Sequence, residues 1–138
     1  MSVTLSPDYT PSEDEEFMNP MQMEYFRQML LNWRSGLIQE AGETLNNLNS
    51  RNLQQPDMAD RASLETHHQL ELRTRDRERK LIIKIDEALA RIENGSYGFC
   101  QDTDEPIGLK RLMARPIAVL SLEAQERHER QERTHRED

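Results

Sequence analysis

The sequence is poor in the residues that build a compact globular core. Of its 138 residues only 35% are hydrophobic and 32% are charged, and it has only five glycines and six prolines. Such a composition disfavours a thick core and favours long helices that bury narrow apolar seams. It predicts a mainly α-helical protein.

The chain also lacks the features of exported and membrane proteins. Cys100 is its single cysteine, so no intrachain disulfide can form, which fits a reducing compartment. No apolar run is long enough for a membrane helix, and the N-terminus shows no signal-peptide pattern. The sequence therefore predicts a cytoplasmic protein that does not associate with a membrane.

Positive charge is in deficit, because the formal net charge is −8. An acidic chain is repelled by phosphate backbones, so non-specific DNA binding is not expected to be its main activity. Direct sequence-specific DNA binding is not expected either. Residues 1–20 hold five acidic and no basic side chains, whereas residues 73–84 hold six basic and two acidic ones. The basic stretch is either an ion-paired helix face or a contact surface.

Local patterns divide the chain into three segments. Residues 1–18 are acidic and lack helical periodicity, which predicts a mobile N-terminal arm. Residues 19–95 are expected to form a helical hairpin, because Asn19-Pro20 is typical of a helix start and Asn94-Gly95 of a helix stop. The connection at residues 53–62 is short, so the two helices should be antiparallel and the connection an exposed tip.

Apolar residues mark the inner face of each predicted helix, recurring at helical spacing. In the first helix they are Phe26, Leu30, Trp33, Leu37, Ala41, Leu45 and Leu48. In the second they are Leu81, Ile82, Ile85, Leu89 and Ile92. This pattern predicts a coiled-coil seam.

Residues 96–138 change character. An acidic stretch separates Tyr97–Cys100 from Pro106–Leu109, which predicts a short β-hairpin turning around residues 102–106. Residues 120–138 carry four Glu–Arg pairs at i,i+4 spacing, which predicts a charged C-terminal helix.

Two carboxylates, Asp57 and Asp60, stand three residues apart at the expected start of the second helix. One interpretation is helix capping together with a favourable helix-dipole interaction. The other is that the projecting acidic tip probes a cavity in another protein. Composition alone leaves both open.

Several motifs together resemble the DksA/TraR family. They are Asp57-x-x-Asp60-x-Ala62, the block Leu70–Ile82, Tyr97-Gly98-x-Cys100 and Ile107-Gly108-x-x-Arg111-Leu112-x-Ala114-Arg115-Pro116. The segment from Phe17 to Phe26 and Trp33 matches as well. The resemblance covers residues 17–125 in order, and the long block around residues 70–82 makes it specific.

The resemblance implies a fold and a function. The fold is mainly α: a long antiparallel coiled-coil hairpin, with a small globular head that contains a zinc-ribbon β-hairpin and a C-terminal helix. The function is that of a non-enzymatic, monomeric regulator of transcription in the stringent response. Its hairpin enters the secondary channel of bacterial RNA polymerase and, with the alarmone ppGpp, changes the stability of open complexes.

The resemblance also assigns residues to roles. The tip positions that contact polymerase are Asp57, Asp60 and Ala62. Arg77 is a candidate contact with the polymerase rim. The candidate ppGpp-binding residues are Leu81, Lys84 and Arg115. Gln125 stands where the family usually has a basic residue, so one contact to the nucleotide is missing.

The metal site departs most from the family, which binds zinc through two cysteine pairs. The equivalent positions here are Cys100, Thr103, Ser121 and Ala124. One thiolate does not make a structural zinc site, which needs four nitrogen or sulfur ligands. His128 and His135 lie in the charged tail and are not expected to replace the missing ligands. We therefore expect a degenerate zinc finger without zinc, with Cys100 as a small buried hydrophobe.

Two alternatives remain at this point. The tip carboxylates could hold a catalytic Mg²⁺ in the polymerase, as in Gre-type transcript-cleavage factors. The chain could also be a coiled-coil adaptor without a polymerase role. Independent enzymatic activity is not expected, because the sequence shows no nucleophile–base pair, no glycine-rich phosphate loop and no metal cluster.

Overall fold

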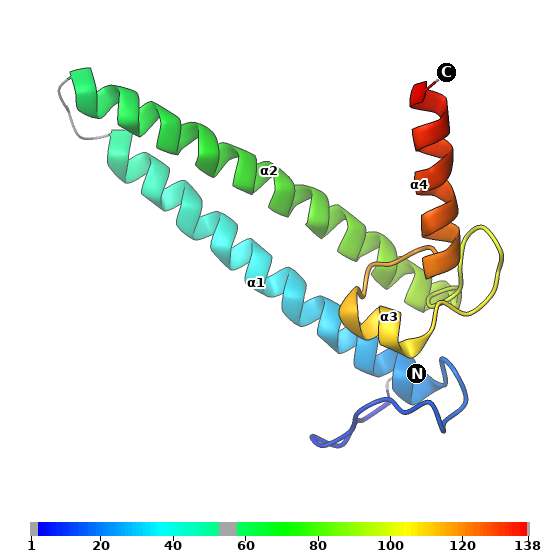
Figure 1. Ribbon diagram of the computed structural model, residues 1–138. Coiled ribbons are helices and arrows are strands. Elements are labelled where there is room, and N and C mark those ends of the chain that lie inside the picture. The colour runs from blue at the N-terminus through cyan, green and yellow to red at the C-terminus, as the bar shows by residue number, and fades with distance from the viewer. Residues whose placement is uncertain (1–2, 53–57, 138) are drawn as a thin grey trace. The chain divides into compact units, whose positions relative to one another are not determined.

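The computed structural model describes residues 3–52 and 58–137, and their side chains outside residues 44–60 and 136–138. It contains the helices α1 (Pro20–Asn52), α2 (Met58–Asn94), α3 (Leu109–Ala114) and α4 (Leu122–Glu137) (Figure 1). The chain divides into two compact units, Leu31–Asp86 and the combined segments Met1–Leu30 and Glu87–Asp138. Among the helices of the described ranges, none has the length and apolarity needed to cross a bilayer.

The ends of the long helices follow from local chemistry. Asn19 Oδ1 accepts a hydrogen bond from the backbone N–H of Gln22 at 2.9 Å, and Pro20 is the first residue of α1. This is the N-cap geometry that asparagine favours. Where α2 ends, Gly95 has a φ of 83°, and the N–H of Ser96 donates to the carbonyl of Arg91 at 2.9 Å. The predicted start of α1 and stop of α2 are confirmed.

The Leu31–Asp86 unit consists of the central parts of α1 and α2, which run antiparallel (Figure 1). Leu37 and Ile85 are buried, and an ion pair joins Arg34 Nε to Asp86 Oδ1 at 2.7 Å. Leu81, Ile82, Trp33 and Ala41 are half-buried. The seam of this unit therefore contains few fully buried apolar side chains. The predicted seam residues Leu45 and Leu48 lie outside the described side chains.

The other unit has the denser core. Phe26, Leu30, Ala88, Tyr97 and Leu112 are all inaccessible to solvent. The rings of Phe26 and Tyr97 are 5.7 Å apart, and the Tyr97 hydroxyl donates to the carbonyl of Pro116 at 2.8 Å. Tyr97 thus connects the start of α1 to the chain that follows α3.

The predicted β-hairpin is reduced to one bridge. Phe99 and Pro106 form an isolated antiparallel bridge, and no strand forms within residues 3–52 and 58–137. The turn begins earlier than expected, because the N–H of Asp104 donates to the carbonyl of Cys100 at 2.8 Å. Proline has no N–H to extend a ladder, and Gly98 and Asp104 have positive φ angles that bend the chain. The segment is therefore too short and too curved for regular strands.

The N-terminal arm also differs from the expectation of a mobile, solvated tail. Gln22 is fully buried, and its Nε2 donates to the carbonyl of Ser12 at 3.2 Å. The ring of Phe17 packs edge-on against Phe99. Met18 packs so tightly against Gly98 that an added Cβ there would lie 2.8 Å from the Met18 side chain. Residues 12–18 are therefore part of the folded unit.

A buried carboxylate weakens the seam of the Leu31–Asp86 unit. Glu78 is only 7% exposed, and its Oε2 has no hydrogen-bond partner among the described residues. Burial raises the pKa of Glu78, and the charge and hydrogen bond of nearby Glu40 raise it further, against the opposing effect of Arg77. Ionised Glu78 therefore destabilises the folded state at neutral pH.

We expect Glu78→Gln to increase the free energy of unfolding at neutral pH by about 1 kcal/mol, since it removes a poorly solvated charge. The folded-state pKa of Glu78 is raised, so the penalty in the natural protein disappears as the pH falls through that pKa. The gain from the substitution should shrink accordingly in urea-unfolding curves measured at decreasing pH. The exposed Glu65→Gln serves as control. A gain that is equal in both variants, or independent of pH, would contradict this account.

Candidate functional site

The expected tip lies at the junction of the two long helices. Asp57 lies outside the described residues, and Asp60 belongs to the first turn of α2, with its side chain outside the described set. Ala62 is exposed on α2. The structure places Asp60 and Ala62 within the first two turns of the 37-residue helix α2, so this helix begins inside the predicted tip of residues 53–62.

Three of the candidate residues share one face of α2. Arg77, Leu81 and Lys84 follow each other at steps of four and three residues, which brings their side chains to the same side of a helix. Arg77 and Lys84 are exposed, and Leu81 is half-buried. Neither cation has a carboxylate within 4.0 Å among the described side chains. The face is therefore available to an anionic or acidic partner.

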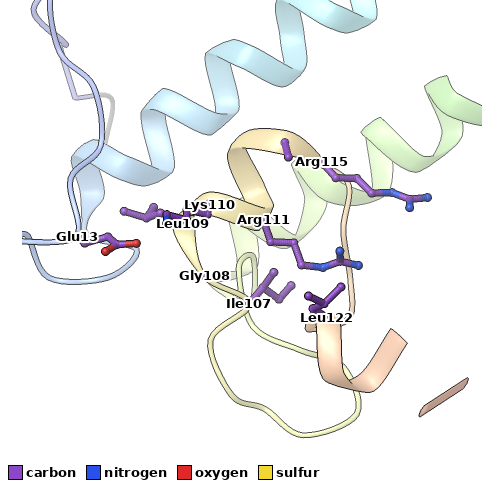
Figure 2. A pocket seen from close by; sticks show the side chains of 9 residues that line it. Glu13, Ile107, Gly108, Leu109, Lys110, Arg111, Arg115 and Leu122 are labelled. Carbon is purple, nitrogen blue, oxygen red and sulfur yellow. The ribbon is translucent and has the colours of Figure 1, made fainter. Parts of the chain in front are cut away.

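A pocket of about 440 Å³ lies around α3 (Figure 2). Its walls combine the apolar residues Ile107, Leu109, Ala114 and Leu122 with Gly108, Lys110, Arg111, Arg115 and Glu13. The Nε of Arg111 donates to the carbonyl of Leu120 at 2.8 Å, which fixes that side chain. Arg115 stands at the C-terminal end of α3 and is exposed. We refer to this site as the α3 pocket.

Sequence reasoning identified Arg115 but missed its companions in the α3 pocket. Arg111 stands four residues before Arg115, a spacing that brings two side chains to the same side of a helix, and Lys110 lines the same pocket. That signal was readable once α3 was assigned. The approach of Glu13 to this cluster was not readable, because 94 residues separate it from Ile107 in the chain.

The positions equivalent to the zinc ligands come together around Cys100. Cys100 is 1% exposed, Ala124 is fully buried, and Thr103 and Ser121 are half-buried. Burial raises the pKa of the Cys100 thiol, but hydrogen bonds from the Thr103 hydroxyl and from the backbone N–H groups of Ser121, Thr103 and Asp102 outweigh it. The net effect lowers this pKa to about 7.

Ser121 and the neighbouring residues Asp102 and His128 make hydrogen bonds that stabilise this region. The Ser121 hydroxyl accepts a hydrogen bond from the N–H of Ala124 at 3.2 Å, which caps α4. His128 Nε2 lies 2.5 Å from Asp102 Oδ2 and ties α4 to the turn after Cys100. One thiolate, two hydroxyls and one methyl group are not the donor set of a structural zinc ion. This donor set does not fit the metal, and the described residues contain no group of three side chains of the kinds that bind metals.

The structure defines a mainly helical protein with two long helices, α1 and α2, that run antiparallel, and a short turn closed by the bridge of Phe99 and Pro106. Two family patterns match the chain. Residues 22–92 match the family described as "DnaK suppressor protein DksA, N-terminal domain". Residues 95–130 match "Prokaryotic dksA/traR C4-type zinc finger".

Individual relatives agree with the family patterns. The chain is 61% identical over 131 residues to the "RNA polymerase-binding transcription factor DksA" of Caulobacter vibrioides, which covers 95% of this chain and 92% of the relative. It is 41% identical over 115 residues to the protein of the same name from Escherichia coli, which covers 83% and 76%. The solved structure of "transcription factor DksA2 from Pseudomonas aeruginosa" superposes with a TM-score of 0.79 at 45% identity, covering 85% and 90%. The chain belongs to the DksA family.

This result confirms the resemblance that the sequence motifs indicated and the mainly helical fold. The zinc-finger pattern covers residues 95–130, which include Cys100, Thr103, Ser121 and Ala124. The zinc-finger pattern therefore matches a sequence that contains only one cysteine, Cys100.

Proposed function

We propose that this protein regulates transcription by binding bacterial RNA polymerase through its secondary channel. There the hairpin tip, together with ppGpp, changes the stability of open complexes. The observation that carries this proposal is the 61% identity, over 95% of the chain, to a protein named for binding RNA polymerase. It acts as a monomer that contributes no reaction of its own.

The helical hairpin suits this task. The 33 residues of α1 and 37 residues of α2 correspond to helices about 50 Å long, enough to carry a tip deep into a channel. The exposed face of Arg77 and Lys84 offers positive charge to a protein or phosphate partner. The net charge of −8 disfavours direct contact with DNA, so the action is expected to pass through the polymerase.

Transcription in vitro from a ribosomal RNA promoter tests the proposal. We expect the protein to reduce transcript yield and to shorten the lifetime of open complexes, and ppGpp to increase both effects. A pull-down with core polymerase should retain the protein, unlike a coiled-coil adaptor. Backtracked complexes should show no added transcript cleavage. Cleavage would favour the Gre-like alternative, and absence of polymerase binding would exclude both.

We also propose that the protein folds and works without zinc. In a four-cysteine ribbon, metal binding supplies folding free energy on the order of 10 kcal/mol. Here the burial of Cys100 and Ala124, the cap at Ser121 and the pair of Asp102 and His128 support the same region.

The expected result is that metal analysis finds well under one zinc per chain. A strong chelator should leave the melting curve and the effect on transcription unchanged, because no ion supports the fold. Cys100→Ser should remain active and lose about 1 kcal/mol at most, since a small buried group is replaced by one of similar size. A four-cysteine relative treated in parallel provides the positive control. Stoichiometric zinc, or unfolding on chelation, would contradict the proposal.

A further inference from the structure

The α3 pocket has an unbalanced charge. Lys110, Arg111 and Arg115 line it, and none of them has a carboxylate within 4.0 Å among the described side chains. Its volume of about 440 Å³ lies in the range of small-molecule sites. Its one acidic lining residue is Glu13, which comes from the N-terminal arm. Figure 2 shows Glu13 at one end of the pocket, near Lys110, with the guanidinium groups of Arg111 and Arg115 extending away from it.

The packing of the arm holds Glu13 in place. The carbonyl of the preceding residue, Ser12, accepts a hydrogen bond from the fully buried Gln22, and the Ser12 N–H donates to the carboxylate of Glu15 at 2.9 Å. Four residues further, Phe17 packs against Phe99. Glu13 is thus anchored on both sides, while its own side chain is exposed and has no ion-pair partner in the described structure.

We infer that Glu13 is an affinity-setting residue of the α3 pocket, whose negative charge weakens the binding of polyphosphorylated nucleotides there. This inference rests on the proposed role of Arg115 in binding ppGpp. The backbone of Glu13 is held in place, so its carboxylate stays at one end of the pocket and repels the phosphate groups of the ligand, while the cations attract them. It therefore raises the nucleotide concentration at which the protein responds. The repulsion acts through solvent, so it weakens as ionic strength increases.

The test is a ppGpp titration of the full-length protein with RNA polymerase at a ribosomal RNA promoter. Glu13→Gln removes the charge at nearly constant size, and Glu13→Lys reverses it. Asp14→Asn is the matched control, because Asp14 is an exposed acidic residue next in sequence that does not line the pocket. Arg115→Ala reports on the nucleotide site itself. All four variants should melt like the natural protein, since none of these side chains is buried.

At about 50 mM salt we expect Glu13→Gln to lower the half-maximal ppGpp concentration about fourfold, and Glu13→Lys to lower it further. At about 300 mM salt the Glu13→Gln shift should fall below about twofold. Asp14→Asn should produce less than about half of the Glu13→Gln shift at either salt, because its charge does not face the pocket.

Equal shifts in Glu13→Gln and Asp14→Asn would overturn the inference, because net charge would then explain them. The absence of a Glu13→Gln shift, in an assay where Arg115→Ala weakens the ppGpp response, would overturn the inference alone and leave the nucleotide site standing. An unchanged titration for Arg115→Ala would remove the nucleotide site, and the inference with it.

Discussion

Asp60→Asn is expected to abolish regulation of a ribosomal RNA promoter while leaving the affinity for polymerase within a few-fold. Asp60 stands in the first turn of α2, next to the connection between the two long helices. Most of the contact area should come from the flanks of the hairpin, so a change at the tip removes the effect rather than the binding. Transcript yield and a polymerase-binding assay measure the two quantities separately.

The same substitution weakens a favourable helix-dipole interaction, at a cost of about 0.5–1 kcal/mol. A melting curve must therefore accompany the assay. Glu65→Gln is a suitable control, because it makes the same acid-to-amide change on an exposed position of α2 five residues along. If Asp60→Asn regulates like the natural protein, or if Glu65→Gln fails equally, the tip does not carry the effect.

Lys84→Ala and Arg115→Ala are each expected to raise the ppGpp concentration needed for half-maximal effect by about tenfold or more. Each removes a charge-assisted hydrogen bond to phosphate, and such bonds contribute about 1.5–3 kcal/mol. The effect of each variant on transcript yield in the absence of ppGpp should be smaller than its effect on the response to ppGpp. The measurement is the ppGpp titration of transcript yield, with each variant compared at equal occupancy of the polymerase.

Arg79→Ala provides the control for Lys84. Arg79 is an exposed cation of α2 that stands five residues earlier, on another face of the helix, and it lies 4.0 Å from Asp76. Gln125→Lys should act in the opposite direction and strengthen the response, because it restores a cation at a half-buried position of α4. Unchanged titrations in Lys84→Ala, Arg115→Ala and Gln125→Lys would remove the nucleotide site from this protein.

The structure revises two expectations of local order. The arm was expected to be mobile because it lacks apolar periodicity, yet Phe17 and Met18 pack into the folded unit. Their partners, Phe99 and Gly98, lie about 80 residues away in sequence, so no local pattern reveals the contact. The predicted β-hairpin, in contrast, is limited by local features. Pro106 and the positive φ of Gly98 restrict strand pairing to one bridge.

Among the charged residues, too, some features can be read from the sequence and others depend on tertiary packing. The basic block of residues 73–84 is plain in the sequence, but the burial of Glu78 within it is not. A glutamate in a charged run is ordinarily solvated. Only the packing of α1 against α2 places its carboxylate beside Glu40 and away from water. The resulting pH dependence therefore belongs to the fold and not to the composition.

The sequence by itself determined where α1 begins, where α2 ends, that the chain has a single cysteine, and the family. Helix caps at Asn19 and Gly95 and the loss of cysteines are local or countable features, so no folding is needed to read them. Only the tertiary structure decided that Glu13 lines the same pocket as Lys110, Arg111 and Arg115, and that the buried Cys100 accepts hydrogen bonds from Thr103, Ser121 and Asp102. Such sites depend on contacts between distant segments, whose energies are set by packing and burial rather than by neighbouring residues.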